Sequence, residues 1–226
     1  MTLSFASAPA LRPARRARLA LPACLVLLGG CPDPEAKFDE FIDNTEDERD
    51  FMPPPEPDLP TVEADISGDF LLAISTIIAP DLPLQFISTN VVTIDMAGAV
   101  TMTSELQPLA LMQGKVTVPR TPIGEPLRYE NLPIVDGSFE IDAGVVMVTG
   151  MANPVTGGDI TATLKMKGSI ISADFYCGTI EGDVMSPLMA PLAGSTFAAV
   201  RISGPMSLPL DVTKNCKMDT VTDMMP

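Results

Sequence analysis

The nine residues Asp159-Ile160-Thr161-Ala162-Thr163-Leu164-Lys165-Met166-Lys167 alternate strictly between polar and apolar side chains. Residues two apart lie on the same face of a β-strand, so the four apolar members share one face and the polar members share the other. Because the stretch is strictly alternating, it predicts a strand with one face on a core and the other face in solvent. The fold class follows from extending this pattern in both directions.

The same period of two recurs on both sides of the stretch. It groups the following residues: Phe70, Leu72, Ile74 and Ile78; then Ile171, Ala173, Phe175 and Cys177; then Ile180 and Val184. No window of twelve residues carries a helical stripe. Strands repeated about every ten residues predict an all-β domain over residues 66–226, an antiparallel meander that closes as a β-sandwich or a β-barrel.

Glycine-containing turns are expected between these strands. The candidates are Asp95-Met96-Ala97-Gly98, Asp142-Ala143-Gly144, Gly157-Gly158, Lys167-Gly168 and Gly178.

The first thirty residues have the composition of an export signal. They contain four arginines and no acidic residue, followed by the apolar run 19–28, which only Pro22 interrupts. Such a basic region, an apolar stretch of about ten residues and small residues before a cleavage point describe a secretory signal peptide. The run is too short for a membrane-spanning helix, which needs about 20 apolar residues.

Leu28-Gly29-Gly30-Cys31 resembles the lipobox of bacterial lipoproteins, in which two small residues precede a cysteine. The resemblance implies that residues 1–30 are removed as a signal peptide and that Cys31 carries the lipid. The protein would then be exported and held on the bacterial membrane by that lipid. Because Pro32 separates Cys31 from the first acid, the expected destination is the outer membrane. The alternative is an ordinary signal peptide cut nearby, which would leave a free thiol.

Residues 31–65 differ in composition from the chain that follows. They hold thirteen acidic residues against Lys37 and Arg49, and a proline-rich stretch covers residues 53–60. High charge with little apolar content cannot offset the conformational entropy of folding. The segment is therefore expected to be a disordered acidic stalk, which proline stiffens in its second half.

Two cysteines lie within the β domain, Cys177 and Cys216. Cys24 leaves with the signal peptide and Cys31 takes the lipid, so the remaining two are expected to form a disulfide in the exported protein. By alternation with Phe175, Cys177 should point inward. Cys216 lies in a tail that would otherwise be free to fray, and the bond should fasten that tail against the sheet. A redox-active pair would have the much shorter Cys-x-x-Cys spacing.

Charge and composition exclude several function classes. The chain holds 14 basic and 29 acidic residues, and removal of residues 1–30 leaves 10 basic residues against 29 acidic. Such a surface repels phosphate backbones, so no nucleic-acid partner is expected. Histidine is absent, which removes the commonest general base and imidazole metal ligands. No cofactor and no metal site are predicted. Met147 and Met166 are interpreted as core filler and not as copper ligands.

Paired carboxylates are the one catalytic pattern that the sequence leaves open. Glu140 and Asp142 are two residues apart, as are Glu181 and Asp183, so each pair lies on one face of a strand. A glycosidase needs only two such groups. The residues between them are Ile141 and Gly182, which favours a solvent-exposed strand face instead.

The expected function is therefore that of a lipid-anchored cell-envelope lipoprotein with a structural or binding role. A β-barrel can hold an apolar ligand, as lipocalins do. Gly68-Asp69-Phe70 resembles the start of that family, but Phe70 stands where lipocalins have tryptophan. No ligand or protein partner is identified by the sequence, and the alternative is a hydrolase that uses paired carboxylates.

Overall fold

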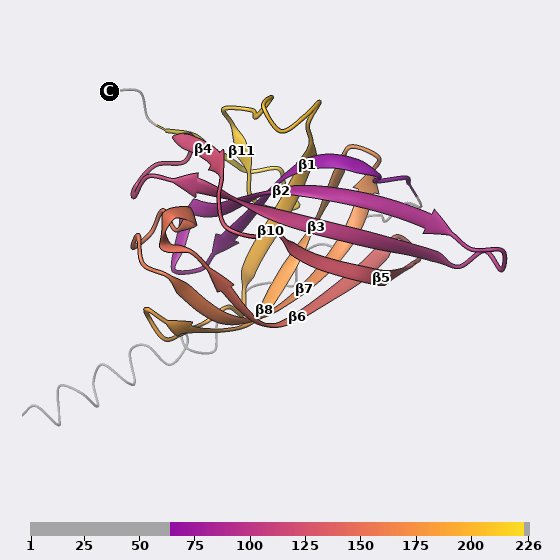
Figure 1. Ribbon diagram of the computed structural model, residues 1–226, viewed down its shortest axis with the longest axis horizontal. Coiled ribbons are helices and arrows are strands. Elements are labelled where there is room, and N and C mark those ends of the chain that lie inside the picture. Colours follow the sequence, from indigo (N-terminus) through magenta and orange to yellow (C-terminus); the bar gives the residue numbers. More distant parts are fainter. Residues whose placement is uncertain (1–63, 224–226) are drawn as a thin grey trace, which may run out of the picture. The chain divides into compact units, whose positions relative to one another are not determined.

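The computed structural model describes residues 64–223 and shows an antiparallel β-barrel (Figure 1). Eight strands form the wall. They are β1 (Gly68–Thr76), β2 (Ala79–Ile94), β3 (Val100–Leu111), β5 (Leu127–Val135), β6 (Ser138–Val148), β7 (Ile160–Ser172), β8 (Phe175–Ser186) and β10 (Ser195–Arg201). The all-β prediction is confirmed, and the meander closes as a barrel because β10 pairs with both β8 and β1.

The remaining elements are short. They are β4 (Pro119–Pro122), the 3₁₀ helix η1 (Gly150–Ala152), β9 (Ala190–Pro191), β11 (Val212–Thr213) and β12 (Thr220–Val221). β4 pairs with β3, β9 extends the edge of β8, and β11 pairs with β12. Within residues 64–223, no helix has the length and hydropathy needed to span a membrane.

The signal peptide, Cys31 and most of the predicted stalk lie outside the described residues. Ala64 and Asp65, the last two residues assigned to the stalk, do lie within them. Ala64 packs against the barrel core, and the carbonyl oxygen of Asp65 accepts a hydrogen bond from Arg201. These two residues therefore belong to the folded part of the chain.

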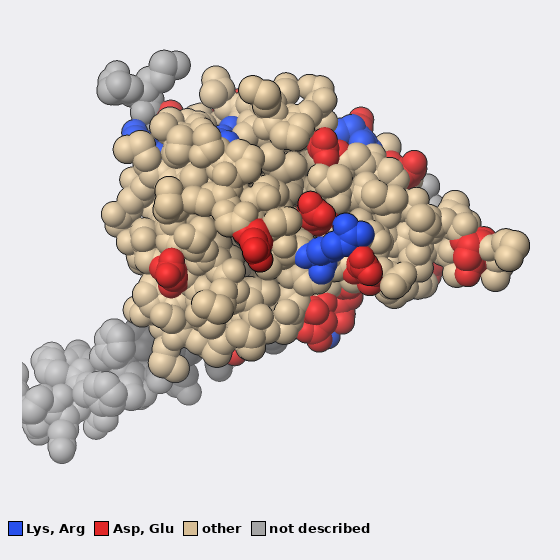
Figure 2. Space-filling model, in the orientation of Figure 1, with Lys and Arg blue, Asp and Glu red and all other residues tan. Residues whose placement is uncertain are grey.

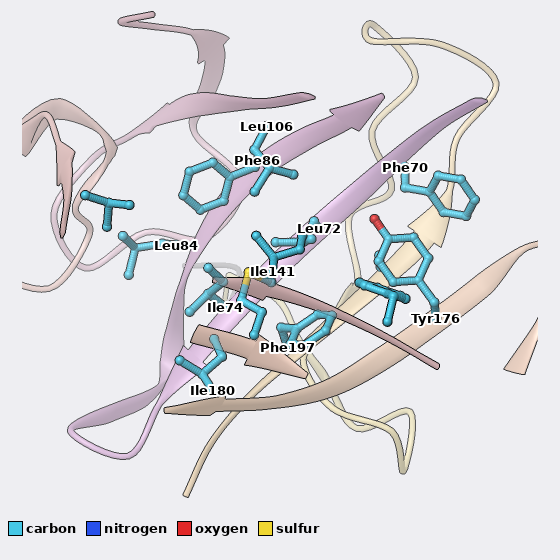
Figure 3. Close-up of a cluster of buried hydrophobic side chains, with 14 of the residues drawn as sticks. Phe70, Leu72, Ile74, Leu84, Phe86, Leu106, Ile141, Tyr176, Ile180 and Phe197 are labelled. Atoms are coloured by element: carbon cyan, nitrogen blue, oxygen red, sulfur yellow. The ribbon is translucent and has the colours of Figure 1, made fainter. Parts of the chain in front are cut away.

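Side chains fill the barrel interior (Figure 3). Tyr176 is shared by three aromatic pairs, with its ring 5.0 Å from Phe70, 5.6 Å from Phe139 and 6.4 Å from Phe197 between centroids, all edge to face. Such aromatic pairs add to the stabilisation from apolar burial. Aliphatic side chains surround this group, among them Leu72, Ile74, Leu84, Leu106, Ile141 and Ile180.

The strand predicted at 159–167 corresponds to the first half of β7. Ala162 and Met166 are buried in the barrel core, and Ile160 and Leu164 pack against it, whereas Lys167 is exposed. The prediction is confirmed. Gly168 does not end the strand, and β7 continues to Ser172.

Three of the predicted turns are wrong, for two different physical reasons. The turn at 95–98 is present, and Gly157-Gly158 lies in the loop before β7, but Gly144, Gly168 and Gly178 lie inside strands. Gly144 forms a β-bulge with φ of 58°, and the other two glycines make room for phenylalanine rings. Ile78, expected on the inner face of β1, instead follows that strand at the hairpin turn.

The expected orientation of Cys177 is also wrong. A turn after Ser172 separates β7 from β8, so Ile171 and Phe175 do not belong to one strand. Tyr176 points into the barrel, and Cys177 points outward, where it is fully buried with Phe175 and Ala198 in a separate apolar cluster. Alternation alone could not distinguish the two faces of β8, because both are covered here.

The C-terminal segment, residues 202–223, covers part of the outer wall. Val212 is fully buried against Leu71 of β1 and Ile87 of β2 in a second apolar cluster. Asp223 accepts hydrogen bonds from the backbone N–H groups of Val116 and Thr117. The segment is therefore packed over the barrel by contacts of its own.

Candidate functional site

The predicted disulfide between Cys177 and Cys216 is confirmed. The two sulfur atoms are bonded, and the Cα atoms are 5.2 Å apart. The bond joins the outer face of β8 to the C-terminal segment, whose Cys216 packs against the cluster of Phe175, Cys177 and Ala198. This position indicates a structural role.

The barrel interior contains a closed ring of hydrogen bonds. The Tyr176 hydroxyl donates to Ser88 Oγ at 2.8 Å, Ser88 donates to Asn90 Oδ1, and Asn90 Nδ2 donates back to Tyr176. Burial raises the pKa of Tyr176 to about 12, although the hydrogen bonds with Ser88 and Asn90 act in the opposite direction. Tyr176 thus stays neutral, and its buried position gives it no route to a substrate.

The paired carboxylates are exposed on the outer face of the barrel. Lys165 Nζ is 2.8 Å from Glu140 Oε1, and Lys167 Nζ is 2.6 Å from Glu181 Oε1. The hydrogen bond from Lys167 lowers the pKa of Glu181. A catalytic acid needs the opposite shift. Glu140 and Glu181 are therefore ion-pair partners of the lysines on β7.

Methionine has two different environments. Met166 is 1% exposed and is core filler, as predicted, whereas Met147 on β6 is 74% exposed, so its assignment to the core is wrong. Among residues 64–223, no group of three or more cysteine, aspartate or glutamate side chains is arranged to hold a metal ion. In Figure 2 most of the visible surface is uncharged, and the basic group at the centre of the view lies among acidic side chains.

The barrel wall opens between β5 and β6. Within the described part of the chain these strands pair only beside their hairpin, where Ile134 lies opposite Phe139 and Val135 opposite Ser138. Further along, β5 remains paired with β3 back to Leu127, and β6 remains paired with β7. The opening between residues 127–131 and 143–148 is called the β5–β6 cleft below.

Three backbone features hold the two strands apart. Asn131 has φ of 56° and lies at an irregularity in the pairing of β5 with β3. Pro133 follows, and it has no N–H group to donate to either neighbouring strand. On the opposite wall, the bulge at Gly144 bends β6. Because bulges bend strands and end regular pairing, these residues explain why the barrel does not close at this point.

The β5–β6 cleft has a volume of about 490 Å³, within the usual range of ligand sites. Its lining alternates along β6: Val146 and Val148 are buried, whereas Val145 and Met147 are exposed. On β5 it is lined by Leu127, Arg128 and Tyr129, and burial raises the pKa of Tyr129.

Charge in the cleft is concentrated at one end. Arg128 Nε is 2.8 Å from Glu130 Oε1, and Arg128 Nη1 is 3.4 Å from Glu105 Oε2. Glu125 also lines the cleft and is exposed, and it has no ion-pair partner among residues 64–223. The charge of this end is therefore negative on balance.

The sequence patterns described above did not locate this cleft. The signal that could have done so is Pro133, because proline within an apolar run indicates a strand edge. The exposed pair Val145 and Met147 carries no signal, since alternation with Val146 and Val148 produces four apolar residues in a row.

No family model, no curated protein and no solved structure matches the chain, so the site rests on its own geometry.

Proposed function

We propose that this protein is a lipid-anchored binding protein of the bacterial cell envelope, and that the β5–β6 cleft is its ligand site. The observation that carries the proposal is the interrupted wall of an otherwise continuous barrel: two strands that remain paired on their outer sides leave a lined cleft between them. The packed interior supports a site in the wall over a site at the barrel centre.

The proposed anchor is the lipid on Cys31, in agreement with the lipobox at residues 28–31. One acyl chain binds a membrane only marginally, and additional chains make anchoring stable. The matched test compares the wild-type chain with Cys31→Ser after export. Wild type should label with radioactive palmitate and remain with membranes after a high-salt wash. Cys31→Ser should lose the label and become soluble. A Cys31→Ser chain that still fractionates with washed membranes would contradict the anchor.

A binding role is supported by the position of the acidic residues. Glu140 and Glu181, one member of each carboxylate pair, form ion pairs with lysines on the outer wall, whereas the cleft is lined largely by strand edges and apolar side chains. In living cells, a photoreactive benzophenone amino acid at Met147 should therefore give a specific adduct. The control is the same replacement at Val135, which is 63% exposed on β5 but pairs with Ser138 outside the cleft. Equal adducts at both positions would contradict a ligand site in the cleft.

A further inference from the structure

The walls of the β5–β6 cleft are two facing strand edges. From Leu127 to Tyr129, β5 is paired with β3 on one side only, and from Gly144 to Val148, β6 is paired with β7 on one side only. Each strand residue carries one N–H donor and one C=O acceptor, and these alternate between its two sides. Both walls therefore present unpaired backbone groups to the cleft, spaced as in a β-ladder.

These unpaired groups determine the class of occupant. An apolar molecule would remove water from them and supply no partner, which costs free energy for every buried donor or acceptor. An extended polypeptide carries donors and acceptors at the same spacing and can pair with both edges. Because β5 and β6 run in opposite directions, the inserted strand would be antiparallel to one and parallel to the other.

The side chains of the cleft define what such a peptide should contain. Val146 and Val148 are each 7% exposed and already packed against the core, so inward positions of the peptide should be small. Val145 and Met147 are 65% and 74% exposed, and apolar residues at the outward positions would cover them. Glu125 at the cleft end would attract a lysine or arginine.

We propose that the β5–β6 cleft binds an extended polypeptide segment of about five residues, which adds a strand between β5 and β6 and closes the barrel wall. The segment alternates small and apolar residues and carries a basic residue at the end near Glu125. This inference rests on the proposed function, because it names the ligand class of the same cleft.

The first experiment pans a phage-displayed library of random twelve-residue peptides against the full chain purified in detergent. Enriched peptides should share alternating apolar residues and a basic residue. The best peptide, made synthetically, should bind wild type and Val135→Lys equally. It should bind Val145→Lys and Met147→Lys at least about tenfold more weakly, because each adds a charge beside the cleft. Glu125→Gln should weaken only peptides that retain the basic residue.

The second experiment tests pairing through the backbone. N-methylation of two peptide residues that are two positions apart removes two backbone hydrogen-bond donors and should weaken binding at least about tenfold. This should hold whether the methylated residues face β5 or β6, because the peptide pairs with both strand edges. Peptide binding should also slow hydrogen–deuterium exchange in residues 143–148. N-methylated peptides that bind as well as the parent would show that side chains alone make the contact, and the proposal would be wrong.

A third measurement separates this inference from the proposed function. A photoreactive palmitate analogue is offered to wild type, Met147→Lys and Val135→Lys. If the analogue labels residues of the cleft, depends on Met147 and not on Val135, and no peptide is enriched, the cleft binds an apolar small molecule. The strand proposal then fails while the binding function stands. If neither probe depends on the cleft, both proposals fail.

Discussion

Gly168 and Gly178 lie directly opposite each other on β7 and β8. The register places Phe139 of β6 beside Gly168 and Phe197 of β10 beside Gly178, so the four residues form one row across four strands. Each phenylalanine ring lies over the neighbouring glycine, in the space that a side chain would otherwise fill. The two glycines therefore serve the packing of the barrel interior and not a turn.

Replacement of Gly178 with alanine should destabilise the barrel. A Cβ atom at this position would overlap the carbonyl oxygen of Lys167 and lie 2.8 Å from the Phe197 ring. Overpacking of this kind costs about 1–3 kcal/mol. The measurement is urea unfolding of Gly178→Ala against Gly204→Ala, whose added Cβ meets no neighbour within 4 Å in the described structure. Equal unfolding midpoints for the two variants would show that the strands have room at Gly178.

The sequence predicts the fold class well because one face of most strands is buried. Residues 159–167 reveal their inner face directly, since the lysines of that stretch remain in solvent. Gly168 and Gly178 mislead because a glycine that makes room for a ring has the same letter as a glycine in a turn. The turn that joins β5 to β6 is Asp136-Gly137, with positive φ at both residues, and it has the usual hairpin sequence.

The cleft is harder to predict than the fold. It depends on where β5 stops pairing with β6, and that depends on the positive φ of Asn131, which the residue type permits but does not require. The orientation of Cys177 depends in the same way on a tertiary contact, because the C-terminal segment covers the outer face of β8. Local pattern carries no information about either.

Loss of the Cys177–Cys216 disulfide should destabilise the domain without changing its strand content. The bond closes a loop with a sequence separation of 39, and the chain-entropy model assigns such a loop about 4 kcal/mol. The double variant Cys177→Ala, Cys216→Ala should therefore lose about 2–5 kcal/mol, which lowers Tm by at least about 5 °C in a domain of this size. Thermal unfolding and far-ultraviolet circular dichroism measure both quantities. Two free thiols in the unreduced exported protein would contradict the bond.

Asp223 should make stability depend on pH in the acidic range. Burial opposes ionisation, but hydrogen bonds from Thr117 and from the Val116 N–H outweigh it and lower the pKa of Asp223 from 3.8. A carboxylate with a lowered folded pKa contributes stability above its unfolded pKa and loses it as the pH falls through the folded value. The contribution is therefore complete at neutral pH and is lost below pH 3.8.

The variant Asp223→Asn isolates this effect. At neutral pH it should cost about 1–2 kcal/mol, because a charged acceptor of several hydrogen bonds is replaced. At about pH 2.5, below the unfolded pKa of 3.8, the difference from wild type should be smaller than at neutral pH. Urea unfolding at both pH values measures it, with the exposed Asp211→Asn as control. A difference that is the same at both pH values would show that the charge of Asp223 contributes nothing.

Hydrogen–deuterium exchange of the free protein should detect the open wall without any ligand. In residues 144–148 and 127–129, amides that point into the β5–β6 cleft have no partner strand, whereas those that point to β7 or β3 are paired. Exchange of a strand amide is slow only while its hydrogen bond holds, so protection in these segments should alternate along the chain. The internal reference is β7, because it pairs with β6 on one side and β8 on the other.

The amides of β7 should therefore be protected almost continuously. Nuclear magnetic resonance measures exchange at single amides and therefore distinguishes this alternation from general flexibility of β5 and β6. General flexibility would give neighbouring amides equal exchange rates. Continuous protection in both segments would mean that β5 and β6 pair along their whole length in solution, and the cleft would then not exist as a binding site.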